Sequence, residues 1–463
     1  MQSYLPGYEL DLATWAYLSS LLTIGVFFKF HRFWSVRNLD LVALIMMAPG
    51  LWWIAQGQRP GGYIWLFMVG GFFLVRLLLD PLMVRRPLLE PNLNASGLTF
   101  TGVALLAFLV GNVVTGDLPP LARQPIQSDV VAAEQTYPLL YSIADLSGEQ
   151  VPAPDGQTEP EQQVRRELAR AVLVRTTAIV AHLALVLGIA LIGYGHFGNV
   201  HTGVAMASLY LLLPYTAEMT PRVDHVVPAA LLVWAVAAYR RPGVAGILLG
   251  LSAGLIGYPL FLLPLWCSFY WRRGLIRFLV GLISGLVLLG VCLALLLALW
   301  RLFGAGEVGS FGQLLGQMFS WASSPWAKAD GFWQDQGGAF LRIPIIAAFC
   351  VLCGSMALWP AQKNLGTLLS CSAAVMLGAQ FWHPYQGGVY IAWYLPLLVL
   401  TVFRPNLEDR LAVTAVTEAW GPWHSGGWTA WRIEGWIPWG REDRMARRKK
   451  GRLSPAQRSE SQA

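Results

Sequence analysis

The sequence predicts an all-α integral membrane protein with about eleven membrane crossings and one re-entrant helix pair. Hydrophobic residues make up 55% of the 463 positions and charged residues only 13%, about half the charged share of an average soluble domain. Apolar runs such as 172–192 and 278–300 are long enough, as helices, to cross a hydrocarbon core of roughly 30 Å. Polar and apolar residues do not alternate in these runs, which argues against the strands of a membrane β-barrel.

The predicted crossings divide the chain into three parts. The first three form an N-terminal extension over residues 1–96, and the rest belong to a core over residues 97–404 with two long outer loops, 115–171 and 303–342. The tail, 405–463, carries six tryptophans between Trp420 and Trp439 and then a basic run, which is typical of a segment on the membrane surface. The crossings are expected near residues 12–28, 40–56, 63–79, 98–114, 172–194, 202–216, 226–239, 278–301, 343–359, 366–382 and 388–403.

Basic residues set the expected orientation, because positively charged loops are retained in the cytoplasm. Arg240 and Arg241 follow the seventh crossing, and basic residues also follow the first, third, ninth and last crossings. The N-terminus is therefore expected outside the plasma (inner) membrane and the C-terminal tail in the cytoplasm. Arg165, Arg166 and Arg170 are exceptions, since they precede the fifth crossing on the outer side.

Residues 243–271 form the expected re-entrant pair. The segment is flanked by basic pairs at both ends, and Gly254, Gly257 and Pro259 interrupt its middle. Two half-helices that meet near Gly257 would place both basic ends in the cytoplasm, in agreement with the positive-inside rule. One long tilted helix is the alternative. Broken backbone at membrane depth is tolerated where protein or a wet cavity covers it, so the segment points to a functional cavity.

Charged residues near the outer ends of the short sixth and seventh crossings are candidates for a site. Arg222, Asp224 and His225 precede or begin a run of only 14 apolar residues, 226–239, so they are expected to dip toward the membrane interface. Two interpretations are open: the three side chains satisfy one another, or Arg222 binds the phosphate of an anionic headgroup.

Three further features each have a structural and a functional interpretation. His182, in the middle of the fifth crossing, either hydrogen-bonds a neighbouring helix or lines a cavity. Arg165, Arg166 and Arg170 either pair with acids of their own loop or bind a lipid phosphate. Asp117 follows the fourth crossing, where it is either a solvated loop residue or a general base for an acceptor hydroxyl.

Residues 205–273 carry a series of apolar and basic motifs that resemble one glycosyltransferase family. They are Leu-Tyr-Leu-Leu-Leu-Pro at 209–214, Arg-Val-Asp-His at 222–225, Tyr-Arg-Arg-Pro-Gly-Val-Ala-Gly at 239–246, Gly-Leu-Ser-Ala-Gly at 250–254, Tyr-Pro-Leu-Phe-Leu-Leu-Pro at 258–264 and Arg-Arg at 272–273. In these motifs the chain resembles the polyprenol-phosphate-dependent glycosyltransferases of the GT-C superfold, and within them the family 87 mannosyltransferase-like membrane proteins. The resemblance is strong over about 15% of the chain and loose over 98–403.

The resemblance implies a GT-C-like multi-helix bundle that moves a mannose-like sugar from polyprenyl phosphate to a glycan or lipid acceptor outside the cell. It implies a catalytic aspartate in loop 115–171, where Asp117 is the nearest position and Asp129 and Asp145 are the fallbacks. Members of the family usually have a lysine just before the Tyr-Pro pair, whereas this chain has Ile256 and Gly257. The residues then expected to bind the donor phosphate are Arg222, Arg165, Arg166 and Arg170. Those expected to line the cavity are Asp224, His225, Tyr258 and His182.

Two other functions stay open at the level of sequence. The chain is also compatible with a transporter or flippase for a lipid-linked solute, although it has few charges within its crossings. It is equally compatible with a non-catalytic membrane component derived from the glycosyltransferase core, which the missing lysine favours. No resident cofactor and no protein metal site are expected, although a divalent metal is compatible with the reaction. The net charge of +7 lies mainly in loops and tail and does not indicate nucleic acid.

Overall fold

The computed structural model shows an all-helical chain, with no β-strand among the described residues. In the described part of the chain, six helical segments are long and apolar enough to cross a membrane, so the protein is a helical membrane protein. Every described residue belongs to one compact unit, Met1–Val416, and the predicted tail lies almost entirely outside the described residues. The structure describes residues 12–83, 90–115, 159–271, 273–302, 332–335, 339–361, 363–384 and 387–405.

The described N-terminal part has five helices and two short 3-10 turns, the first of which is η1 (Phe30–Arg32). The expected crossing at 40–56 is divided at Met46 into two helices, and Ser35 caps the first of them by accepting a hydrogen bond from the Asn38 backbone N–H. The other expected crossings of this part each appear as a single helix. The elements are α1 (Leu12–Phe27), α2 (Val36–Ile45), α3 (Met47–Ala55), α4 (Arg59–Leu79), η2 (Asp80–Leu82) and α5 (Ala95–Thr115).

The middle of the chain begins with α8 (Glu159–Gly195), whose 37 residues extend about 55 Å. This helix begins well before the expected crossing at 172–194, and only Leu168–Gly195 is apolar enough to span. The expected crossing at 202–216 is not one helix. It is broken before Pro214, because a residue that precedes proline is forced out of the α conformation and Leu213 is extended. The result is α9 (Val200–Leu212) and the short α10 (Pro214–Glu218), followed by α11 (Val223–Ala237).

Two glycines allow α8 and α9 to pack closely as an antiparallel pair. A Cβ atom added to Gly193 would lie 2.2 Å from the Cα atom of Gly203, so neither position has room for a side chain. Small residues at helix interfaces let backbones approach in this way in membrane proteins. The close packing fixes the register of α9 on α8, and it brings Tyr210 against His182 farther along the pair.

The segment 243–271 turns back on itself at Gly257. Its first half is α12 (Pro242–Ile256), which ends because Gly257 has a φ of +73°, a conformation that favours glycine. Its second half is η4 (Tyr258–Leu262) followed by α13 (Leu263–Phe269). The Tyr270 hydroxyl donates a hydrogen bond of 2.6 Å to the Tyr239 carbonyl, so the two ends of the segment lie side by side.

Helix α14 (Leu275–Leu302) packs along α12 in the same direction. Cβ atoms added at Gly246 and Gly250 would lie 2.2 Å from the carbonyl oxygens of Phe278 and Leu282, so a four-residue step along α12 matches a four-residue step along α14. Gly281 and Gly285 of α14 face the α12 backbone in the same way. Because the two helices are parallel, the chain between them must return to its starting end, and η4 and α13 make that return.

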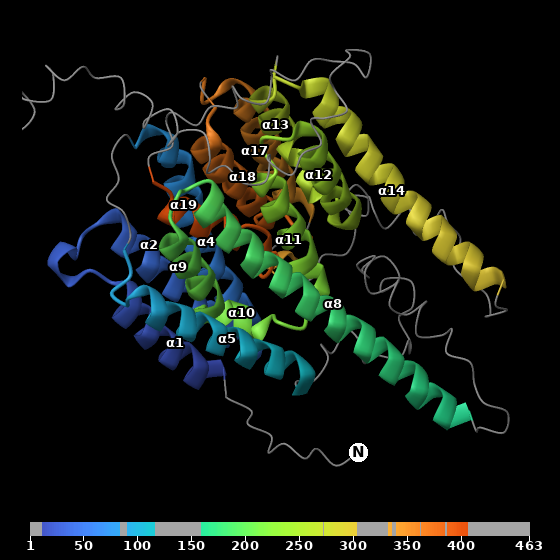
Figure 1. The fold of residues 1–463 in the computed structure, drawn as a ribbon, viewed down its shortest axis with the longest axis horizontal. Helices are drawn as coiled ribbons and strands as arrows, with labels where there is room; N and C mark the ends of the chain where they lie inside the picture. Colours follow the sequence, from blue (N-terminus) through green and yellow to red (C-terminus); the bar gives the residue numbers. More distant parts are fainter. Residues whose placement is uncertain are drawn as a thin grey trace, which may run out of the picture. The chain divides into compact units, whose positions relative to one another are not determined.

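The C-terminal helices surround one fully buried helix, α18 (Leu365–Gln380). All of its residues are buried, and it contacts α4, α13, α17 and α19, as Figure 1 shows for the adjacent α17, α18 and α19. The expected crossing at 388–403 is helical only from Leu395, because an irregular stretch and a 3-10 turn precede it. The remaining elements are α16 (Phe332–Asp335), α17 (Ala339–Leu358), η6 (Ile391–Trp393) and α19 (Leu395–Phe403).

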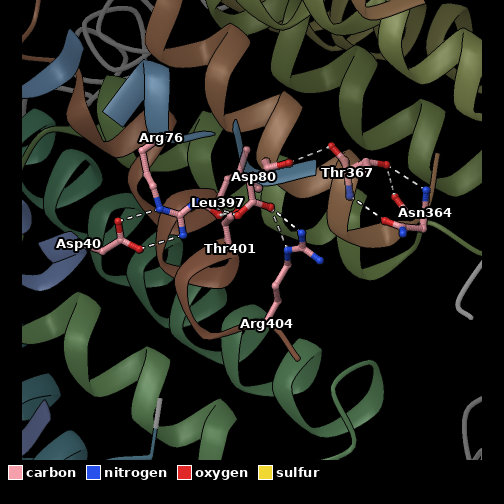
Figure 2. A network of polar contacts seen from close by, with 9 residues as sticks. Asp40, Arg76, Asp80, Asn364, Thr367, Leu397, Thr401 and Arg404 are labelled. Atoms are coloured by element: carbon pink, nitrogen blue, oxygen red, sulfur yellow. Dashed lines mark hydrogen bonds and ion pairs between the residues drawn. The ribbon is translucent and has the colours of Figure 1, made fainter. Parts of the chain in front are cut away.

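A buried network of two aspartates and two arginines joins the N-terminal helices to the end of α19 (Figure 2). Arg76 of α4 donates two hydrogen bonds of 3.0 Å to Asp40 of α2 and one of 2.9 Å to Asp80. Arg404 donates to the other oxygen of Asp80. The orientation was predicted from basic residues near the ends of the crossings, and these include Arg76 and Arg404. In the structure, aspartates compensate the charges of both arginines.

Candidate functional site

Arg222, Asp224 and His225 come together at the start of α11, next to α10. An Nη1 atom of Arg222 lies 3.4 Å from Nε2 of His225, and the same Nε2 atom lies 3.6 Å from a carboxylate oxygen of Asp224. The hydroxyl of Tyr215, in α10, lies 2.6 Å from Nδ1 of His225. Arg222 and Asp224 thus both lie close to the same nitrogen of His225, and the Asp224 contact is longer than a hydrogen bond. Asp224 also lies in the first helical turn, where the helix dipole favours a negative charge.

Aromatic side chains from two distant segments form a wall beside this group. Tyr390 lies 4.6 Å from the His225 ring and 4.6 Å from the His383 ring, measured between centroids. Tyr258, the first residue of η4, stacks on His383 at 4.9 Å, and Trp393 stacks on Tyr390 at 4.5 Å. The wall thus joins the turn after α12 to the chain that follows α18, and Tyr258 is linked to His225 through the rings of His383 and Tyr390.

The backbone of α11 is tied directly to this aromatic wall. The indole N–H of Trp393 donates a hydrogen bond of 3.2 Å to the Asp224 carbonyl, although 169 residues separate the two. This carbonyl lies in the first turn of α11, so the bond attaches the site end of the helix to η6. Asp224, His225, Tyr258 and Trp393 are all buried, whereas Arg222 and Tyr390 are half-buried and form the accessible rim of the group.

Residues of α16 and of the start of α17 hydrogen-bond the backbone at the end of α18, next to the wall. Arg342 donates hydrogen bonds of 3.3 and 3.2 Å from Nε and Nη2 to the Trp382 carbonyl, just after the end of α18. The indole N–H of Trp333 donates to the neighbouring Phe381 carbonyl at 3.2 Å. Trp333 belongs to the expected outer loop 303–342, so that loop supplies at least one contact that fixes the site segment.

His182 is buried between α8, α9 and the turn before α11. Its Nε2 atom lies 3.1 Å from the Thr220 carbonyl, and its Nδ1 atom lies 3.3 Å from the Tyr210 hydroxyl. Both ring nitrogens therefore have protein partners, which is the hydrogen-bonded interpretation of this histidine. Thr216 and Thr220 continue the polar contacts around the turn, since the Thr216 hydroxyl donates to the Tyr210 carbonyl and the Thr220 hydroxyl to the Thr216 carbonyl.

Asp117 and the fallback positions Asp129 and Asp145 lie outside the described residues. The chain that leads to Asp117 is described up to Thr115, and its last turn lies beside the site. The Asn112 side chain in that turn donates a hydrogen bond of 3.1 Å to the Ala217 carbonyl of α10.

The outer arginines belong to the N-terminal half of α8. The side chains of Arg165 and Arg166 lie outside the described residues, and Arg170 is half-buried. Twelve residues separate Arg170 from His182, or about 18 Å along the helix. Arg170 therefore lies on the same helix as His182, which contacts the Thr220 carbonyl, but well away from that contact.

Three residues of the wall, His383, Tyr390 and Trp393, were not predicted from the sequence. They are separated from His225 by more than 150 positions, so no local spacing relates them to it. One signal was available: His383 directly follows the apolar run 366–382, and an ionisable residue at the edge of a crossing is a candidate for a site. Its relation to Tyr258 and His225 depends on how α18 packs.

Among the described residues, no group of three or more histidine, cysteine, aspartate or glutamate side chains is arranged to hold a metal ion. The group at the start of α11 instead offers one guanidinium on the rim, a buried carboxylate and imidazole behind it, and an aromatic wall. Such a set can bind an anionic group attached to an apolar or cyclic molecule. Comparisons with protein-family profiles, with curated proteins and with solved structures found no match to this chain.

Proposed function

We propose that the protein is a membrane glycosyltransferase that moves a mannose-like sugar from polyprenyl phosphate to a glycan or lipid acceptor outside the cell. The observation that carries the proposal is the hydrogen bond between Asn112 and Ala217. It holds the end of α5, which is described up to Thr115, beside α10, and α10 contacts the start of α11 through Tyr215 and His225. In the proposal, Asp117, two residues beyond Thr115, supplies the base and Arg222 the phosphate ligand.

Arg222 is assigned to the donor phosphate. A guanidinium can give two parallel hydrogen bonds to a phosphate, and Arg222 is the N-cap residue of α11, where the helix dipole also favours an anion. It is half-buried, so a lipid headgroup can reach it. In this proposal Arg222 replaces the lysine that the family has before the Tyr-Pro pair, and the arginines of α8, Arg165, Arg166 and Arg170, attract the anionic headgroup from farther out.

The proposed reaction needs one base and one stabilised leaving group. The Asp117 carboxylate removes the proton from the acceptor hydroxyl as its oxygen attacks the anomeric carbon of the sugar. The bond between that carbon and the phosphate oxygen breaks, and polyprenyl phosphate leaves with the bonding electrons. Arg222 stabilises the negative charge that develops on the phosphate. His225, Asp224, Tyr258 and the aromatic wall close the inner side of the site.

The proposed membrane arrangement has eleven crossings, with the N-terminus outside and the C-terminus inside. Residues 242–269 enter from the cytoplasmic side and return to it, with Gly257 at the tip. The hydrogen bond between Tyr270 and Tyr239 supports this arrangement, because it holds the two basic ends of the segment together. Tyr258 then projects from the tip toward the outer site.

Transfer from a labelled short-chain polyprenyl phosphate mannose to endogenous membrane acceptors tests the proposal. We expect transfer in membrane vesicles that contain the full chain and none in vesicles with Asp117→Asn, which keeps the shape of the side chain but removes the base. Glu90→Gln, a change of an exposed acid, is the matched control and is expected to retain activity. Retained transfer in Asp117→Asn would exclude Asp117 from the mechanism, and movement of the labelled lipid across the bilayer without transfer would identify a flippase instead.

A further inference from the structure

We infer that His225 is a positioning residue that fixes the direction of the Arg222 guanidinium, and that Tyr215 fixes His225 in turn. The inference rests on the proposed function, in which Arg222 contacts the phosphate of the lipid donor. It adds that the phosphate affinity of this site depends on an imidazole that does not itself touch the ligand. The three residues form one chain of polar contacts from the interior to the rim.

The chemistry of the partners assigns the hydrogens in this chain. A guanidinium has only N–H donors, so the contact of 3.4 Å between Arg222 Nη1 and His225 Nε2 requires Nε2 to accept. The imidazole then carries its proton on Nδ1 and donates it to the Tyr215 hydroxyl oxygen, 2.6 Å away. His225 is therefore neutral, with a defined tautomer, and its two nitrogens hold Arg222 and Tyr215 on opposite sides.

Packing prevents the imidazole from turning away. The His225 side chain is fully buried, and Tyr215 is only 3% exposed. The Tyr215 ring lies almost parallel to the imidazole, at an interplanar angle of 19°, and the Tyr390 ring lies 4.6 Å from it. The bond from Trp393 to the Asp224 carbonyl fixes the backbone one residue earlier. The acceptor offered to Arg222 thus has a fixed position.

A fixed acceptor matters because arginine is a long, flexible side chain at the rim of the site. A guanidinium that is already directed toward the ligand loses less rotamer freedom when it binds. Asp224 alone would not set this direction, because a carboxylate accepts from many angles, whereas the Nε2 lone pair lies in the plane of a ring that cannot rotate. Loss of the Nε2 acceptor should therefore weaken phosphate binding without removing the cation.

Two amide substitutions distinguish the roles of the two imidazole nitrogens of His225. In His225→Gln the longer side chain can place its carbonyl oxygen near the former Nε2 and still accept from Arg222. In His225→Asn the amide reaches only the former Nδ1, so it keeps a partner for Tyr215 and removes the Nε2 acceptor that directs Arg222. Both variants put a neutral amide in the same buried place, so a general effect on folding should be similar in both.

The measurement is the affinity of the full chain in detergent for farnesyl phosphate, with uncharged farnesol as the reference ligand. We expect His225→Asn to weaken farnesyl phosphate binding by roughly ten- to hundredfold, the usual range for a hydrogen bond to a charged group. His225→Gln should bind within a few fold of the parent protein, and farnesol affinity should be unchanged in both. Tyr215→Phe should give an intermediate loss for farnesyl phosphate alone.

The outcomes distinguish this inference from the proposed function. If Arg222→Ala weakens farnesyl phosphate binding but His225→Asn does not, the positioning role is excluded while the phosphate role of Arg222 stands. If Arg222→Ala has no effect, both are overturned. Equal losses for farnesyl phosphate and farnesol in His225→Asn, or equal losses in the Gln and Asn variants, would show a structural role only and would also overturn the inference.

Discussion

Arg404 donates two hydrogen bonds to one carboxylate oxygen of Asp80, which lies 324 residues earlier in the chain. The two bonds measure 3.1 Å from Nε and 2.5 Å from Nη2. The other oxygen of Asp80 accepts from Arg76, so this carboxylate connects the end of α19 to α4. The expected N-terminal extension and the end of the expected core are thus joined by a buried ionic contact.

We predict that Asp80→Ala destabilises the protein by about 3–5 kcal/mol, because it removes the carboxylate that pairs with the buried Arg404 guanidinium and leaves Arg76 with Asp40 alone. The free energy of unfolding, measured in mixed detergent micelles with increasing SDS, checks this value. Glu90→Ala removes an exposed carboxylate from the same region and should change stability by less than about 0.5 kcal/mol.

The double variant Asp80→Leu with Arg404→Met tests whether the loss of stability in Asp80→Ala comes from an unpaired buried charge. A buried ion pair replaced by apolar groups often costs little, so the double variant should be more stable than Asp80→Ala. A double variant that is less stable than Asp80→Ala would contradict this explanation.

Gly250→Ala is predicted to separate α12 from α14. The new methyl group would lie 2.2 Å from the Leu282 carbonyl oxygen, so one helix has to move, at a cost of about 1–3 kcal/mol. The same unfolding measurement applies. Gly290→Ala, on α14 itself, meets nothing within 4 Å and is the control, because it should leave stability unchanged or slightly raised. Equal effects at the two glycines would mean that the close packing is not needed for stability.

His182→Phe is predicted to act on stability and not on ligand affinity. The substitution removes the contacts to the Thr220 carbonyl and the Tyr210 hydroxyl, and the loss of these buried hydrogen bonds should cost about 1–3 kcal/mol. His31→Phe changes an exposed histidine and is the comparison. If His182→Phe weakens farnesyl phosphate binding and leaves stability unchanged, the prediction is wrong. His182 then lines the cavity, which is the second of the two interpretations given in the sequence analysis.

Trp393→Phe tests the tie between η6 and α11. Phenylalanine keeps an aromatic ring in the wall but cannot donate to the Asp224 carbonyl, so a loss of about 1 kcal/mol is expected. Trp52→Phe, in a more exposed position of α3, serves as the control. Hydrogen exchange at the first turn of α11 gives an independent measurement, and it should become faster only in Trp393→Phe.

The sequence predicted the turn at Gly257 well, because its cause is local. Gly254, Gly257 and Pro259 interrupt an otherwise apolar run, and α12 ends at Ile256. Pro214 gave an equally local signal, yet the crossing at 202–216 was predicted as one helix, and the proline in fact divides it. The crossing at 388–403 was placed by its apolar composition alone, which does not distinguish the 3-10 turn η6 from a helix.

The contacts among the candidate-site residues could be expected from the sequence only where the residues are neighbours. Arg222, Asp224 and His225 are neighbours, and their charge within an apolar region identified them. His383 and Trp393 join them through the packing of α18 and η6, which no local pattern encodes. Arg76 and Arg404 show the same limit, because composition shows a positive charge but not the aspartate, far away in the chain, that neutralises it.

The complete burial of α18 has a consequence for biosynthesis. This helix is synthesised after α4, α12, α13 and α17, yet it is in contact with α4 and α13 as well as α17. The earlier helices therefore have to leave an opening in the bilayer, filled by lipid or by an insertion factor, until α18 enters it. Chains that terminate before Leu365 would keep that opening, and cellular quality control should recognise them as unfinished.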